Sequence, residues 1–84
     1  MVFDTERLTI RGRLAVKEAD ARNLALSIEG DVATVRMLLP PFAPIVELQA
    51  QQAAVQAVEL AGKHAEYLGL LAEIANMKKA LGIV

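Results

Sequence analysis

The stretch that divides this chain is Pro40-Pro41-Phe42-Ala43-Pro44, close to the middle of its 84 residues. Proline lacks the amide hydrogen that a helix interior needs, and it pushes the preceding residue out of the α region. A helix that precedes this stretch must therefore end at it. Pro44 is suited to the first position of a second helix, where proline is favoured. The sequence thus predicts two helical segments joined by a proline corner at 40–44.

Before the corner, apolar residues recur with the heptad period of a packed helix. One series of core positions holds Phe3, Ile10, Leu24 and Leu38, the other holds Leu14, Ala21, Ile28 and Val35, and Arg7, Lys17 and Asp31 interrupt them. This pattern predicts a first helix over about 4–39. Asp4 is suited to its N-cap, and Phe3 and Leu8 occupy the two positions of a hydrophobic staple.

Two features of the first segment leave alternatives open. Gly30-Asp31 has the form of a helix stop followed by a new N-cap, so the first helix could be broken there. Residues 8–16 also alternate between apolar and polar side chains, which is the period of a strand.

After the corner, the composition favours one long helix over 44–81. No proline occurs from Ile45 to Leu81, and alanine, glutamine and leucine are frequent. Lys78 and Lys79 fall in the last turn, where the helix dipole favours cations. Gly82 occupies the position of the left-handed residue in a Schellman ending.

Two long helices joined by a short corner are expected to fold back into an antiparallel hairpin. With the corner centred near Phe42, facing residues lie equally far from it along the chain. This register places opposite charges together, pairing Arg36 with Glu47, Asp20 with Lys63, and Lys17 with Glu66. The sequence therefore predicts an all-α fold, a single helical-hairpin domain over 1–84.

The part of each arm nearest the corner is apolar in nearly every direction, more than a two-helix hairpin can bury. A second copy could cover this surplus by forming a four-helix bundle, or a different protein could cover it. The predicted interface residues are Leu24, Ile28, Val32, Val35, Leu38, Leu39, Phe42, Ile45, Leu48 and Val55. Phe42, at the corner, has the character of an interface anchor.

Other classes of function find little support. The formal net charge of −1 and the scarcity of aromatic residues near Arg7, Arg11 and Arg13 argue against a nucleic-acid partner. His64, the single histidine, has neither the partners of a general base nor enough companions for a metal site. We therefore expect no catalytic residues, cofactor or metal.

The compartment follows from similar considerations. The chain has no cysteine, and its first residues include Asp4 and Glu6 where a signal peptide would be basic. The longest uncharged apolar run, Met37 to Val46, contains all three prolines and is too short for a membrane span. These features predict a cytoplasmic protein without a membrane contact.

The sequence thus predicts an interaction module: a homodimeric helical assembly or scaffold protein, without enzymatic activity. The alternative is a small accessory protein, of the kind that phages and mobile elements carry, which binds or inhibits a larger host protein through its apolar helical face. A more distant alternative is an N-terminal β-element that contacts nucleic acid.

Overall fold

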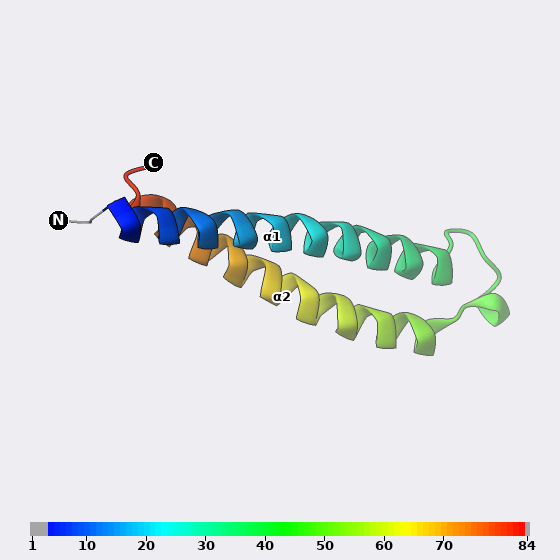
Figure 1. Ribbon diagram of the computed structural model, residues 1–84. Helices are drawn as coiled ribbons and strands as arrows, with labels where there is room; N and C mark the ends of the chain where they lie inside the picture. Colours follow the sequence, from blue (N-terminus) through cyan, green and yellow to red (C-terminus); the bar gives the residue numbers. More distant parts are fainter. Residues whose placement is uncertain (1–3, 84) are drawn as a thin grey trace.

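The computed structural model describes residues 4–83, and these form two long helices and one short one. Helix α1 spans Asp4–Leu38, the 3₁₀ helix η1 spans Ile45–Glu47, and α2 spans Ala50–Ala80. The two long helices run antiparallel and pack against each other (Figure 1). The expected all-α hairpin is confirmed.

Helix α1 is continuous, so neither alternative for the first segment holds. It runs through Gly30, where the sequence permitted a break, and through residues 8–16, where a strand was possible. The heptad pattern explains this outcome, because a helix places Ile10, Leu14, Ala21 and Ile28 on one face toward α2. A strand over 8–16 would have had no partner strand. Phe3, and with it the expected staple, lies outside the described residues.

The start of the second helix was predicted wrongly. Pro44 precedes η1 instead of opening α2, and Leu48 after η1 is extended (φ −68°, ψ 135°). Helix propensity explains why α2 begins later in the sequence than predicted. Ile45 and Val46 are β-branched and weak helix formers, whereas the stretch from Ala50 is rich in alanine and glutamine. The connection between the long helices is therefore the whole of residues 39–49, twice as long as the predicted corner.

The longer connection also corrects the predicted register. Lys17 pairs with Glu73 and not with Glu66, and Lys63 pairs with Asp31 and not with Asp20. The first of these shifts is one heptad. The apolar pattern could not distinguish the two registers, because shifting one helix by a heptad along the other again places core positions opposite core positions.

The end of α2 follows the prediction. Gly82 has a φ of +76°, the amide of Gly82 donates to the carbonyl of Lys79 (3.0 Å), and the amide of Ile83 donates to that of Lys78 (2.8 Å). These two bonds define the Schellman motif. Arg7 of α1 donates to the carbonyl of Leu81 at 3.1 Å, which ties this end to the start of the chain.

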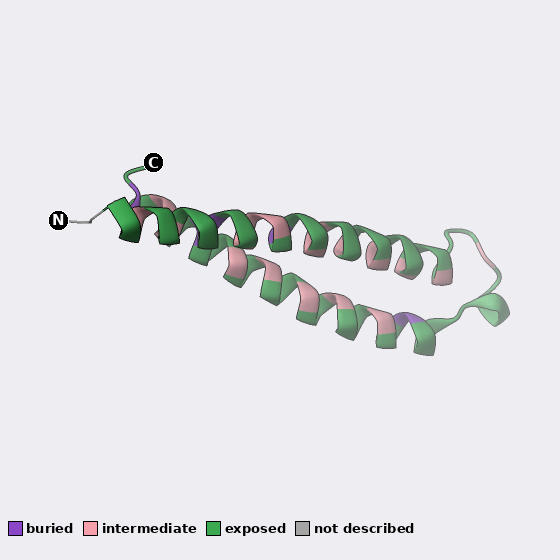
Figure 2. Ribbon diagram, viewed as in Figure 1, coloured by how far each residue is buried: buried purple, intermediate pink, exposed green. Residues whose placement is uncertain are grey.

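The buried core is small and lies mainly toward the two termini. Leu14, Ala21, Ile74 and Leu81 form one buried cluster, and Ala53 is buried separately at the start of α2 (Figure 2). At the connection the two helix ends remain joined, because the amide of Gln49 donates to the carbonyl of Leu38 (3.4 Å). The molecule is a rod of 65 × 18 × 14 Å. Its radius of gyration is 18.8 Å, against about 12 Å for a compact domain of this length.

Candidate protein-binding surface

On each long helix, the residues that face the other helix form a regular series. The buried and half-buried positions include a series spaced alternately by three and four residues, from Ile10 to Leu38 on α1 and from Ala53 to Leu81 on α2. This is the spacing of a coiled-coil seam. The seam positions are Ile10, Leu14, Lys17, Ala21, Leu24, Ile28, Asp31, Val35 and Leu38 on α1, and Ala53, Gln56, Leu60, Lys63, Tyr67, Leu70, Ile74, Met77 and Leu81 on α2.

Two charged pairs span the seam. Lys63 Nζ lies 3.0 Å from Asp31 Oδ2 and donates to Ser27 Oγ at 2.8 Å. The side chains of Lys63 and Asp31 are 27% and 15% exposed. Oδ2 of Asp31 is shielded from solvent and has no hydrogen-bond partner among residues 4–83, so its contact with Lys63 is an ionic one. A charge held this way depends on its counter-ion.

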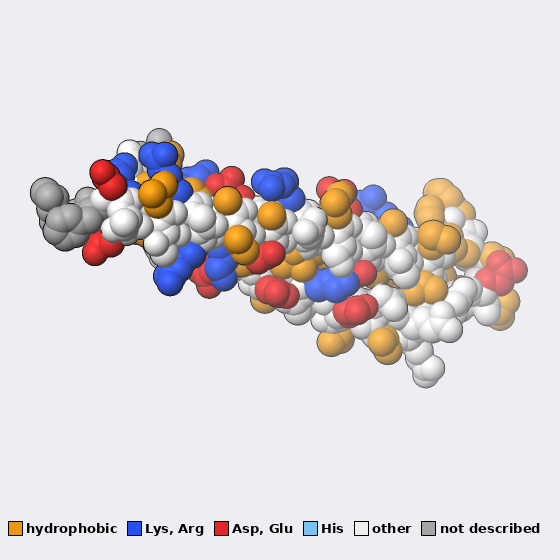
Figure 3. Space-filling model, in the orientation of Figure 1, with side chains coloured by type: hydrophobic (Ala, Val, Ile, Leu, Met, Phe, Trp, Pro, Cys, Tyr) orange, Lys and Arg blue, Asp and Glu red, His pale blue; other side chains and the backbone are white. Residues whose placement is uncertain are grey.

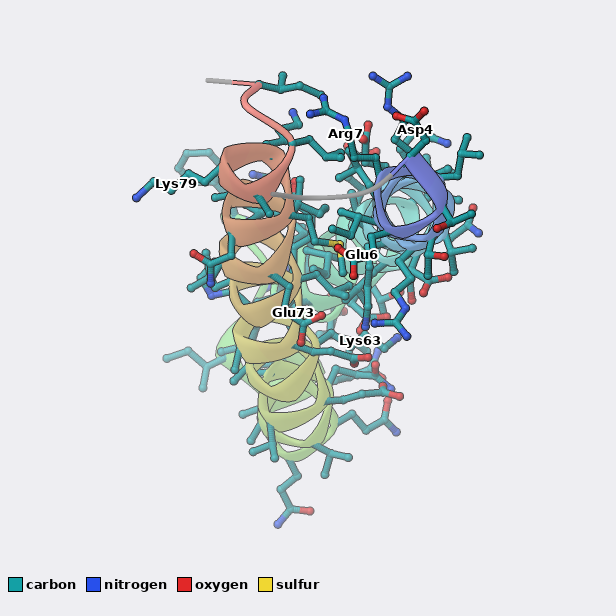
Figure 4. The ribbon with its side chains drawn as sticks, turned by 60° about the vertical axis from the view of Figure 1, so that its left-hand side comes forward. Asp4, Glu6, Arg7, Lys63, Glu73 and Lys79 are labelled. Atoms are coloured by element: carbon teal, nitrogen blue, oxygen red, sulfur yellow. The ribbon has the colours of Figure 1, made fainter. Side chains whose placement is uncertain are left out.

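The second pair joins Lys17 to Glu73, with Nζ 2.9 Å from Oε2. The hydrogen bond from Lys17 to Glu73, and then the negative charge of Glu73, raise the pKa of Lys17 above its ordinary value. Figure 4 shows Glu73 and Lys63 directed from α2 toward α1, whereas Lys79 points away from α1. We name Lys17, Ser27, Asp31, Lys63 and Glu73 the polar side of the hairpin.

Large apolar side chains are exposed mainly toward the connection. Phe42 is fully exposed, and Ile45 and Val46 are 85% and 92% exposed. Figure 3 shows orange side chains gathered over the end of the rod that holds the connection, where few charges accompany them. The exposed members between Leu24 and Leu60 are Leu26, Met37, Leu39, Phe42, Ile45, Val46, Leu48, Val55 and Val58.

The structure separates the predicted interface residues into two groups. Leu24, Ile28, Val32, Val35 and Leu38 are half-buried along α1, and four of these five are seam positions that already face α2. The second group is exposed and consists of Leu39, Phe42, Ile45, Leu48 and Val55. Whether either group touches a partner stays a prediction.

Phe42 is distinguished further by its backbone. Its φ of +66° lies in the left-handed region, which costs a residue with a side chain about 1–2 kcal/mol. Its ring is not buried within the chain, so no packing of the ring offsets this cost. Strained residues that the fold itself does not need are often functional.

Other candidate sites are weak. An open groove of about 450 Å³ lies beside the seam near the connection, lined by Thr34, Leu38, Gln51, Gln52, Val55 and Gln56. His64 is exposed on α2. Within residues 4–83 no three histidine, aspartate or glutamate side chains are grouped as metal ligands would be.

Neither described helix contains a stretch long and apolar enough to cross a membrane. Comparison of the chain with protein-family models, with curated proteins and with solved structures gives no significant match. The function must therefore be inferred from this molecule's own surface.

Proposed function

We propose that this chain is a protein–protein interaction module that self-associates into a homodimeric helical bundle and serves in assembly, without catalysis. The observation that carries the proposal is the cluster of exposed apolar side chains toward the connection, with Phe42, Ile45 and Val46 at its tip. Clusters of exposed apolar side chains often mark interaction surfaces in proteins.

The distribution of charge supports the same proposal. Residues 24–60 contain Glu29, Asp31, Arg36, Glu47 and Glu59 as their only charged side chains. The remaining, charge-rich part of the hairpin is the part that holds the buried cluster. The half with the least charge is therefore also the half that the chain itself covers least.

The test is the absolute mass in solution, measured by light scattering on a sizing column over a wide range of concentrations. A mass of twice 9.0 kDa supports self-association. A stable mass of one chain at every concentration overturns the homodimer.

A second candidate function is docking on a larger protein, as an accessory protein or inhibitor. Phe42 favours it, because an exposed aromatic ring on a strained backbone resembles an interface anchor. In that case Phe42→Ser would leave the mass and helicity unchanged and abolish binding to that protein. A Phe42→Ser variant that binds as tightly as the unmodified chain would contradict this function.

A further inference from the structure

The two series of seam positions differ in chemistry, and this difference gives the hairpin two unlike sides. The first series contains all five buried residues of the described chain, Leu14, Ala21, Ala53, Ile74 and Leu81. From Leu14 to Leu81 this series carries no charge. Its members are Leu14, Ala21, Ile28 and Val35 on α1, and Ala53, Leu60, Tyr67, Ile74 and Leu81 on α2.

The second series contains Lys17, Asp31, Gln56 and Lys63, the charged and amide residues of the seam. In an antiparallel helix pair, the two series lie toward opposite sides of the seam. The contacts agree with this geometry, since Lys17 reaches Glu73 and Lys63 reaches Asp31 and Ser27. The polar side is therefore occupied by ion pairs.

Within residues 4–83, no ion pair is found on the opposite side. The positions that flank the first series on α1 include Ala25 and Val32, both half-buried, and Leu39; on α2 they include Ala57 and Leu71. We name Ala25, Val32, Leu39, Ala57 and Leu71 the apolar side. The equivalent positions nearer the termini are charged, with Arg11 and Glu18 on α1 and Lys78 on α2, and the exposed His64 lies between Ala57 and Leu71.

The surface area indicates how large an occupant this side requires. The chain exposes 6339 Å², whereas a compact monomer of 9.0 kDa exposes about 4,850 Å². The excess is about 1,500 Å² for each chain, which makes about 3,000 Å² for two copies. Obligate homodimers bury between about 2,000 and 5,000 Å². One second copy is therefore enough to cover it.

We propose that the apolar side is the face on which a second copy of this chain packs. This inference rests on the proposed self-association and adds which face carries it. Near the connection the shapes are self-complementary, because α1 offers the bulky Val32 and Leu39 and α2 offers the small Ala50 and Ala57. Farther from the connection the order is reversed, with Ala25 on α1 and Leu71 on α2. A two-fold axis that sets α1 of one copy against α2 of the other brings bulky residues onto small ones twice.

The polar side serves this purpose poorly. A partner placed there would remove Lys17, Glu73 and the partly exposed Lys63 from water, and desolvating charges offsets most of what burial contributes. The open groove with Thr34 and Gln52 on that side holds three glutamine amides and a hydroxyl, beside Leu38 and Val55. In the dimer these groups and the ion pairs stay on the outside.

Two glutamate substitutions on α2 test the proposal. Ala57 lies on the apolar side, and Gln52 lines the groove on the other side; both are exposed, so neither change disturbs the hairpin itself. Ala57→Glu is expected to weaken the dimer by at least about 100-fold, because it buries an unpaired carboxylate. Gln52→Glu is expected to change the dissociation constant by less than about 3-fold. Leu71→Glu provides an independent second site on the apolar side.

The readout is mass against concentration by sedimentation equilibrium, with circular dichroism to establish equal helicity. A dimeric unmodified chain with Ala57→Glu and Leu71→Glu shifted toward monomer supports the assigned face. A dimer that Gln52→Glu weakens and Ala57→Glu and Leu71→Glu leave intact keeps the proposed function and overturns the assigned face. A monomer of the unmodified chain at all concentrations overturns both.

Discussion

Phe42 combines a positive φ with full exposure of its ring, so burial of the side chain within the hairpin does not offset the strain of the backbone. Glycine adopts the same backbone without steric strain. Phe42→Gly is therefore expected to raise the free energy of unfolding of the hairpin by up to about 1 kcal/mol, part of the relief being lost to the greater freedom of the unfolded chain. Urea unfolding at a low concentration, where association is minimal, measures this change.

The matched control is Gly82→Ala, which places a side chain where φ is +76° and is expected to destabilise the chain by about 1 kcal/mol. If Phe42→Gly were destabilising at equal m-value, the ring would have to contribute packing within the folded chain, and its assignment as an interface residue would lose its basis.

The Lys17–Glu73 pair makes a prediction about titration. Because Glu73 raises the pKa of Lys17, Glu73→Gln should return the Lys17 pKa toward its ordinary value in a titration followed by NMR. The proton is held more tightly in the folded state than in the unfolded chain. The stabilisation is thus fully present below the unfolded-state pKa and is lost as the pH rises through the raised folded-state pKa. An unchanged Lys17 titration in the variant would contradict the pairing.

At the scale of the helices, substitutions in the Lys63–Asp31 pair test both the stability of the hairpin and the register of its two helices. Lys63→Met leaves Asp31 shielded without its counter-ion, and the expected loss is about 2–3 kcal/mol, since both side chains are more than two-thirds buried. The double variant Lys63→Met with Asp31→Leu replaces the pair by apolar side chains and should recover most of that loss. A double-mutant cycle from urea unfolding gives the coupling energy between them.

The same cycle tests the register. Lys63→Met combined with Asp20→Leu should show additive effects, because Asp20 does not face Lys63 in the observed register. Strong coupling between Lys63 and Asp20, with none between Lys63 and Asp31, would restore the register that the proline corner suggested.

The sequence predicts some elements of this fold more accurately than others. Helix α1 was predictable almost to the residue, because its heptad pattern is long and Pro40 fixes its end. The connection was not, because Pro44 permits a helix to begin without requiring one, and the weak helix formers Ile45 and Val46 decide the matter locally. Because the connection is longer than the predicted corner, α2 is displaced along α1, and Lys17 meets Glu73, one heptad beyond the predicted Glu66.

The candidate surface was predictable only in part. The apolar surplus near the corner is visible from composition, and the exposed Phe42, Ile45 and Leu48 agree with it. The two unlike sides were missed, although Lys17 and Asp31 already appeared as interruptions of the α1 pattern. A charged residue at a core position could have been read as marking one side of the seam, but its partner on α2 depends on the register.

At the scale of the whole molecule, a thin rod with few buried side chains has little stability of its own, so association and folding should be coupled. If two copies form one bundle, the midpoint of thermal unfolding must rise with protein concentration by mass action.

Val35→Asp is expected to lower that midpoint and to reduce its dependence on concentration, because Val35 is half-buried where α1 faces α2 and a carboxylate there has no partner. Circular dichroism melts over a hundredfold range of concentration give both quantities. Glu66→Lys, at an exposed position outside the seam, is the matched charge change and should shift the midpoint little. A midpoint independent of concentration in the unmodified chain would mean that the hairpin folds alone, and its exposed apolar side chains would then be available to a different protein.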